Sequence, residues 1–238
     1  LRLDRCIPTA IQTQTQPPPP ASPAYYGDLK RILTAAGLRD AQPRFYITKA
    51  IVNAVALAGV VALSLWSPNL PTLIASAALW GFMLTQNGLL AHDVAHRQVF
   101  RKGRGVIIAG WILGNLLMGV SYSWWTNKHN VHHANPNHIT DDPDANYPML
   151  AMFPEQVAQR SKWARPVIAI QPYIYPLLGM FLFVTFRAPA IAMIIRGNLP
   201  ARIPQAIGFV LHFALFGLLL TQLGGWPQAL TYFVVSQV

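Results

Sequence analysis

Five of the seven histidines fall into two short clusters whose spacing suits metal binding. The first cluster, HDVAH, contains His92 and His96, and the second, HNVHH, contains His129, His132 and His133. Residues three or four apart share one face of a helix, so a helical cluster presents its imidazole rings on one side. Neutral imidazole is a good ligand for iron, copper, zinc and nickel. The two clusters therefore predict a metal site.

The number of rings indicates what kind of metal site this is. One histidine at a membrane rim is as readily an interfacial or hydrogen-bonded residue, but two clusters at ligand spacing are much harder to explain in that way. Five protein ligands exceed what one tetrahedral zinc ion accepts, so more than one ion is expected. The single cysteine, Cys6, lies in a segment rich in proline and glutamine, which excludes an intrachain disulfide and a cysteine-held metal cluster.

Several carboxylates near the clusters are candidates for a supporting role. Asp93, inside the first cluster, either accepts the second ring N–H of a ligand histidine and fixes its tautomer, or is a surface charge. Asp142 and Asp144 are open to the same two interpretations, with Lys128 or an arginine as an alternative partner. For Asp141 we expect only a role in solvating its loop.

The two remaining histidines are expected outside the ligand set. His138 follows the second cluster in a loop rich in proline and asparagine, where it would support the site or lie at the surface. His212 falls in the middle of the apolar run LHFALF. Ionisable residues inside apolar spans are often functional, but the depth of His212 separates it from a site at the membrane rim and favours a helix-packing role.

The composition indicates that these residues stand in a membrane protein. Of the 238 residues, 53% are hydrophobic and 11% are charged, compared with roughly 25% charged residues in an ordinary soluble domain. Basic residues outnumber acidic ones 18 to 8, and they gather before residue 50 and between Arg97 and Arg165, leaving long uncharged stretches. This distribution is typical of the cytoplasmic loops of a membrane protein, and no nucleic-acid-binding module is recognisable.

Apolar segments predict an all-α membrane bundle. Residues 47–66 and 71–91 are each about 20 residues of mostly apolar sequence, the length that a helix needs to cross the hydrocarbon. Their link is uncharged and basic residues flank their outer ends, so the positive-inside rule places both outer ends, and His92 beside them, on the cytoplasmic side. Another span is expected at 206–223, and residues 229–238 would begin a return crossing.

Two further apolar segments are expected not to cross. Residues 105–122 separate the two histidine clusters, and a single crossing would place these on opposite faces of the membrane. We therefore expect this segment to lie in or near the membrane plane within the bundle, where Gly110 and Gly114 would allow close helix approach. The arginines of 187–202 are expected inside, so residues 166–186 are predicted to be re-entrant or interfacial.

The amino-terminal part differs in composition from the rest. Residues 1–24 are rich in proline and glutamine without apolar periodicity, which predicts disorder, and residues 25–238 are expected to form one domain. Between Leu29 and Leu38, apolar residues at near-helical spacing alternate with basic ones, which predicts a helix on the membrane surface or an ordinary packed helix. The chain begins without methionine and stops inside an apolar run, so we expect a fragment.

The histidine clusters resemble two motifs of the membrane fatty acid desaturase family. Its H-x3-H and H-x2-HH boxes match HDVAH and the KHNVHHANPN–DPD stretch position by position, and the resemblance extends over residues 25–238, with YYGDLKRILTAAGL and a WW pair. It implies four transmembrane helices under a cytosolic cap, two non-haem irons held by histidines from three boxes, and O2-dependent insertion of a double bond into a fatty acyl chain. The third box has no counterpart before Val238, so the rest of the site is expected beyond the return crossing.

The resemblance also implies the partners of such a protein, which are the lipid bilayer, a fatty acyl substrate and a source of electrons. No HPGG-type haem-binding motif is present, so the electrons are expected from a separate cytochrome b5, ferredoxin or reductase. The acyl chain is expected in an apolar tunnel among large aromatic residues, namely Trp80, Phe82, Trp111 and Trp124.

Two alternatives stay open. The same iron ligands would serve hydroxylation of a lipid or an alkane, and box spacing does not separate this from desaturation. The second alternative is a non-redox membrane receptor or zinc-dependent hydrolase with histidines at the rim.

Overall fold

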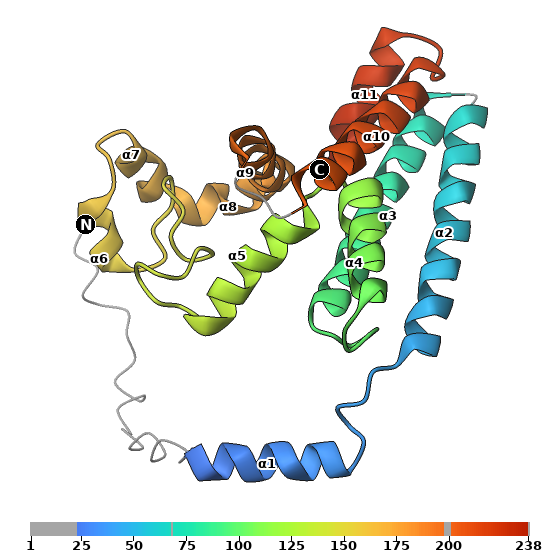
Figure 1. Cartoon of the computed structure of the whole chain (residues 1–238). Coiled ribbons are helices and arrows are strands. Elements are labelled where there is room, and N and C mark those ends of the chain that lie inside the picture. Colours follow the sequence, from blue (N-terminus) through green and yellow to red (C-terminus); the bar gives the residue numbers. More distant parts are fainter. Residues whose placement is uncertain (1–22, 68, 198–200, 238) are drawn as a thin grey trace, which may run out of the picture. The chain divides into compact units, whose positions relative to one another are not determined.

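The computed structural model describes residues 23–67, 69–197 and 201–237 (Figure 1). The regular structure of these residues is helical, which confirms the predicted all-α class. The helices are α1 (Pro23–Ala35), α2 (Pro43–Trp66), α3 (Leu70–Ala95), α4 (Arg104–Gly110), the π-helix η2 (Trp111–Met118), α5 (Tyr122–Ala134), α6 (Pro154–Gln159), α7 (Ala164–Ala169), α8 (Gln171–Gly179), α9 (Leu182–Arg196), α10 (Arg202–Thr221) and α11 (Trp226–Gln237).

The described residues divide into two units, which separate between Asp40 and Ala41. In the first unit, α1 covers most of the helix predicted between Leu29 and Leu38 but begins earlier and ends at Ala35. It ends there because Gly37 adopts a left-handed conformation, with φ of 70°, which terminates a helix. Disorder was predicted for residues 1–24. Residues 1–22 lie outside the described residues, and Pro23 and Ala24 belong to α1.

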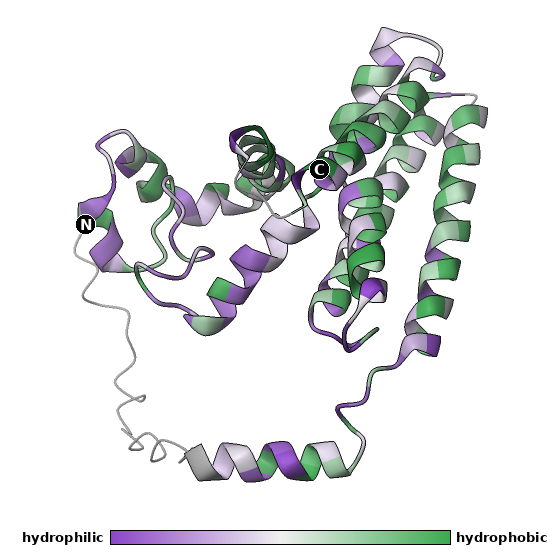
Figure 2. Ribbon diagram, viewed as in Figure 1, coloured by the Kyte–Doolittle hydropathy of each residue, from purple (hydrophilic) through white to green (hydrophobic). Residues whose placement is uncertain are grey.

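Among the described residues of the second unit, four helical segments are long and apolar enough to cross a membrane: α2, α3, α10 and the stretch Leu177–Arg196. The bent pair Arg104–Met118 and Tyr122–Ala134 passes the same test only if it is taken as one span. Large apolar side chains on the outer face of α2 are exposed, among them Ile51 and Val55, at 59% and 67%. An exposed apolar face of this kind is favoured in hydrocarbon and unfavourable in water. Figure 2 shows the same hydrophobic colouring along α2, α3 and α10, and a hydrophilic one over much of α5 and α6.

The bundle core lies between α3, α10 and α11. Leu73 and Ala77 of α3 meet Phe216 of α10 and Tyr232 of α11 in one buried cluster. The phenol of Tyr232 also shares a 2.9 Å hydrogen bond with the Ser64 hydroxyl of α2. These contacts bind α11 to α3, so the segment expected to begin a return crossing does run back along the bundle.

Residues 105–122 turn back inside the bundle. The α-helix α4 continues as the π-helix η2, which ends at Gly119, with φ of 66°. After this break, α5 leaves at a bend of 105°. The segment therefore does not carry the chain to the opposite end of α3, which is the condition that the two histidine clusters impose.

The predicted boundaries of the apolar segment 166–186 were wrong. This stretch is broken into α7, α8 and the start of α9, and α9 continues past Arg187 to Arg196. Arg187 can lie within the helix because its guanidinium donates to the backbone carbonyls of Met118 and Gly119 instead of to water. Figure 1 views α9 nearly along its axis and α2, α3 and α10 lengthwise, so α9 is not aligned with those helices.

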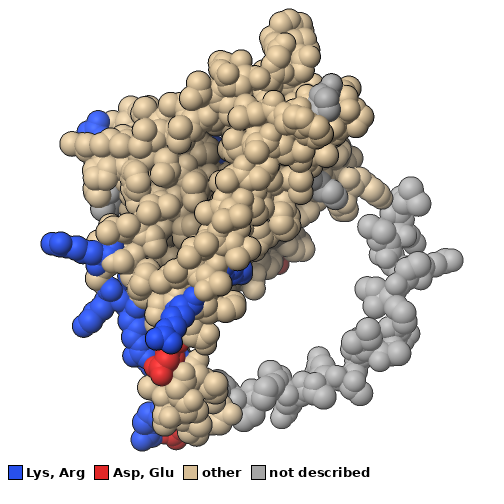
Figure 3. Space-filling model, turned by 90° about the vertical axis from the view of Figure 1, so that its right-hand side faces the viewer, with Lys and Arg blue, Asp and Glu red and all other residues tan. Residues whose placement is uncertain are grey.

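Charged residues distinguish the two ends of the bundle. The backbone N–H of Gln42 donates to the carbonyl of Gln98 over 2.8 Å, which places the start of α2 beside the loop after α3. Exposed basic residues gather at this end: Arg44, Lys49, Arg97, Arg101, Lys102 and Arg104. On the face of the bundle drawn in Figure 3, most of the surface is uncharged. The turns at the other end, 67–69 and 222–225, contain no charged residue.

Candidate metal centre

Two helix ends bring the histidine clusters together. His92 lies in the last turn of α3, and His96 is the residue that caps it. The second cluster lies in the last two turns of α5, whose N-terminus is capped by Ser121 through a hydrogen bond from the Trp124 N–H. Because the chain turns back between η2 and α5, the second cluster returns to the end of α3 that carries the first.

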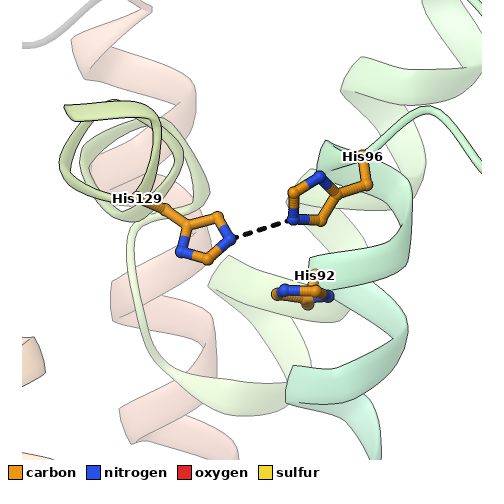
Figure 4. Close-up of side chains that lie close together, drawn as sticks. All are labelled: His92, His96 and His129. Carbon is orange, nitrogen blue, oxygen red and sulfur yellow. Dashed lines mark hydrogen bonds between the residues drawn. The ribbon is translucent and has the colours of Figure 1, made fainter. Parts of the chain in front are cut away.

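Three imidazole rings form the centre of the group. One ring nitrogen from each of His92, His96 and His129 lies within 4.8 Å of the other two, and Nε2 of His96 is 3.0 Å from Nε2 of His129. Figure 4 shows the rings of His96 and His129 facing each other across the gap between the helices, with His92 beside them. Nitrogens so arranged can share one metal ion.

The remaining two histidines lie at the edge of this group. Nε2 of His133 is 3.0 Å from Nε2 of His129, and its ring is centred 4.9 Å from that of His96. The His132 ring is centred 6.2 Å from that of His129 and turns toward a carboxylate. The structure thus brings all five predicted ligands to one end of the bundle, with His132 the most distant from the centre.

Asp142 is the carboxylate that His132 meets. Nδ1 of His132 lies 2.9 Å from Oδ1 of Asp142, and the backbone N–H groups of Asn137 and Asp144 also donate to this carboxylate. Asp142 is only 1% exposed. With Nδ1–H donating to Asp142, the lone pair of His132 is on Nε2. A carboxylate in this position can orient the ring of a ligand histidine. One atom each of His132, Asp142 and Asp144 also lie within 4.8 Å of one another, a spacing that can hold a metal ion.

The other candidate carboxylates have weaker connections to the group. Oδ1 of Asp93 is 3.3 Å from Nδ1 of His92. Asp144 forms an ion pair with Lys128 and lies 3.6 Å from Nδ1 of His132. His138 does not join the group, because it is exposed and its Nδ1 accepts the backbone N–H of Asp141.

Two histidines of the group, His96 and His129, have a lowered pKa. Burial, and then the neighbouring rings of the group, together lower the pKa of His129 to about 4. Burial, and then the neighbouring His92 and His133, also lower the pKa of His96. Burial alone would raise the pKa of Asp142, but the hydrogen bonds from His132 and from two backbone N–H groups bring it below its usual value. Near neutral pH, His96 and His129 are therefore uncharged and can donate lone pairs, and Asp142 is ionised.

Trp125 is a member of the group that the spacing of the histidines did not reveal. Its ring stacks on that of His129 with centroids 4.4 Å apart and planes 19° apart, and its edge meets His92. The spacing in the sequence could have indicated this contact, because Trp125 precedes His129 by four residues and so lies on the same face of α5.

A cavity of about 730 Å³ lies between α3, the break, α9 and α11. Its lining is mostly apolar and includes Thr85 and Phe82 of α3, Phe183 of α9 and Val235 of α11. Thr85 precedes His92 by two turns, or about 10 Å along the helix.

The lining includes only one of the four aromatic residues predicted to form a tunnel, Phe82. The indole N–H of Trp111 donates to the carbonyl of Pro204. Trp80 packs against the bundle core, and Trp124 belongs to a separate buried cluster. Aromatic content alone did not distinguish side chains that pack between helices from those that line a cavity.

Comparisons with known proteins agree on one family. The family model described as "Fatty acid desaturase" matches residues 64–238. The Acyl-lipid (9-3)-desaturase of Physcomitrium patens is 31% identical over 47% of this chain and 21% of its own length. For the Delta(8)-fatty-acid desaturase of Euglena gracilis the values are 32%, 65% and 36%, and for the Delta(5) fatty acid desaturase fat-4 of Caenorhabditis elegans they are 28%, 90% and 49%.

The chain thus spans half or less of the length of these curated relatives. No solved structure matches it significantly.

Proposed function

Because the chain belongs to the fatty acid desaturase family, we propose that the protein is an O2-dependent fatty acyl desaturase that inserts a C=C bond. The observation that carries this proposal is the meeting of two histidine clusters from distant segments, with three ring nitrogens within 4.8 Å of one another. Breaking an unactivated C–H bond is beyond any protein side chain, so the reaction requires a redox-active metal.

In this proposal His92, His96, His129, His132 and His133 are ligands of a pair of non-haem irons. The donor set supports this, since the ligand atoms are imidazole nitrogens and the lowered pKa values of His96 and His129 leave their lone pairs free. When bound, the irons would supply the activation of O2 and the removal of two hydrogens. The chain's own residues hold the site: Asp142 fixes the His132 ring, and Trp125 covers His129.

The substrate we propose is a fatty acyl chain, bound with its tail in the 730 Å³ cavity. The cavity is mostly apolar and extends from about two turns below His92. Its volume falls in the range of small-molecule binding sites, about 300–1,000 Å³. Residues 25–238 would belong to one desaturase domain, with further ligands supplied by a third histidine box.

We place the histidine clusters at the cytoplasmic face of the membrane. The support is the basic end of the bundle, where Arg44 and the loop from Arg97 to Arg104 flank the first cluster, and the uncharged turns at the opposite end. Electrons would come from an external donor, a cytochrome b5, ferredoxin or reductase, which would reach the site from this side.

Histidine substitutions in the full-length protein test the assignment. His129→Ala and His132→Ala should each abolish the unsaturated product and lower the bound iron from about two per chain. His138→Ala is the matched control, because His138 is exposed and outside the group, and it should retain both. Product analysis by mass spectrometry would count against desaturation if the product gained an oxygen instead of losing two hydrogens. One zinc per chain would overturn the redox assignment.

A further inference from the structure

The break between η2 and α5 exposes backbone groups inside an apolar bundle. The last carbonyls of a helix have no partners within it, and the first N–H groups of the next helix have none either. Irregular backbone at membrane depth is stable only where protein side chains satisfy such groups. At this break, side chains of α9 and α10 do so.

Gln205 of α10 joins the two sides of the break. Its side-chain oxygen accepts hydrogen bonds from Asn115 of η2 and, over 2.9 Å, from Ser121. Its amide nitrogen donates to the hydroxyl of Ser123 over 2.8 Å. Asn115 in turn accepts the N–H of Tyr122. Gln205 is 5% exposed, and Asn115 and Ser121 are fully buried.

His212 contacts the same break from about two turns further along α10. Its Nδ1 lies 2.9 Å from the carbonyl oxygen of Leu116, in the last turn of η2. Its ring fills the space beside Gly119, where an added Cβ would stand 2.3 Å from the ring. The helix-packing role predicted for His212 thus has a defined partner.

Arg187 approaches from α9. Its guanidinium donates through Nε to the Gly119 carbonyl over 3.2 Å and through Nη2 to the Met118 carbonyl over 3.0 Å. Nη1 donates to the side-chain oxygen of Gln237 at the end of α11. A cation at the carbonyl end of a helix also interacts favourably with the helix dipole.

We propose that Arg187, Gln205 and His212 form a polar clamp, which sets the angle at which α5 leaves the break and so positions the second histidine cluster against the first. His129 is far enough from the break for a change of angle there to move it: it lies seven residues beyond the start of α5, about 10 Å along the helix axis. A small rotation at the break would therefore part the Nε2 atoms of His96 and His129, which are 3.0 Å apart.

The clamp also forms part of the cavity wall. Met118, Val120 and Arg187 all line the cavity proposed for the acyl chain. The same hydrogen bonds thus fix the cavity wall and the second cluster in one arrangement. This inference rests on the proposed function only in taking the histidines as ligands and the cavity as the acyl site.

A distance measurement tests the clamp without relying on activity. Spin labels at Lys102→Cys and Asn127→Cys, both exposed, would report the separation of the α3–α4 loop and α5 in the full-length protein, with native cysteines replaced and diamagnetic zinc in place of iron. Arg187→Met should widen the distance distribution and add a displaced population. Arg196→Met is the matched control on the same helix, because Arg196 is exposed, and it should leave the distribution unchanged.

Iron binding gives a second readout. Arg187→Met should weaken iron affinity by about 10-fold or more, as loss of groups that orient ligands commonly does, and Arg187→Lys should restore part of it. Gln205→Met removes the amide contacts without removing a charge, and it keeps the test decisive if Arg187→Met does not fold. A folded Arg187→Met or Gln205→Met protein with the parental distance distribution would overturn the clamp. Failure of every protein, the parent included, to bind iron would count against the proposed function, whereas the distance measurement would still decide on the clamp.

Discussion

At the scale of single residues, the sequence reveals the ring nitrogens but not what orients them. The spacing of His92, His96, His129, His132 and His133 was sufficient to predict a shared site. Whether Asp142 and Asp144 support a histidine or pair elsewhere stayed open, because the answer depends on how the loop after α5 folds back. The structure distinguishes the two carboxylates by burial, since Asp142 is 1% exposed and accepts hydrogen bonds from two backbone N–H groups.

Asp142→Asn should weaken iron binding by about 10- to 100-fold, the usual effect of losing a group that orients a metal ligand. The new amide NH2 is a donor and would face groups that now donate hydrogen bonds to the carboxylate. The His132 ring would then lose the partner that fixes its tautomer. Iron titration of the purified full-length protein measures the change. Asp141→Asn is the neighbouring control, since Asp141 is exposed, and equal losses in both variants would contradict the role of Asp142.

At the scale of helices, apolar length was the informative property of the sequence, and it was informative only in part. It placed α2, α3 and α10 within a few residues of their bounds. It did not reveal that residues 104–118 end in a π-helix, or that α9 contains Arg187. Both segments form hydrogen bonds with partners about 70 to 90 residues away, as from Arg187 to Met118 and from Asn115 to Gln205. The local spacing of apolar residues does not reveal such partners.

Gly119→Ala should destabilise the protein by at least about 1–2 kcal/mol, the cost of a left-handed conformation for a residue with a Cβ. The added carbon would also displace the His212 ring. Thermal unfolding in detergent micelles, followed by circular dichroism, measures the effect. Gly217→Ala on α10 is the control, because nothing lies within 4 Å of its added Cβ, and it should be neutral or stabilising by up to about 1 kcal/mol. Equal stability of the two variants would contradict the tight approach at Gly119.

At the scale of the whole molecule, the distribution of charge was a better guide to the arrangement of the helices and histidine clusters than the number of apolar segments was. The expectation that both clusters lie at one basic end agrees with the positions of His96, His129 and the Arg97–Arg104 loop. The apolar count was less reliable, since Leu177–Arg196 qualifies as a span by length and composition although residues 166–186 were expected to be re-entrant or interfacial. A long apolar run identifies hydrocarbon as the solvent but does not give the direction of the helix in it.

Labelling with a membrane-impermeant maleimide in sealed vesicles tests this arrangement. Lys102→Cys and Asn127→Cys should react from the same side, and Gln222→Cys, in the turn at the opposite end, should react only from the other side. The uncharged turns and the basic loop give the expected orientation, with the first two positions cytoplasmic. Reaction of Lys102→Cys and Asn127→Cys from opposite sides would mean that residues 104–134 cross the membrane, and the shared metal site would be excluded.

The position of Arg187 has a consequence for the way the protein is made. An arginine at the centre of an inserting helix costs about 2.5–3.5 kcal/mol on insertion scales. The chain is synthesised from its N-terminus, so the carbonyls of Met118 and Gly119 have already left the ribosome when Arg187 emerges. When the apolar segment around Arg187 enters the membrane, the hydrogen-bond acceptors for its guanidinium have therefore already been synthesised. The order of the helices along the chain thus helps to lower the free-energy cost of inserting this arginine.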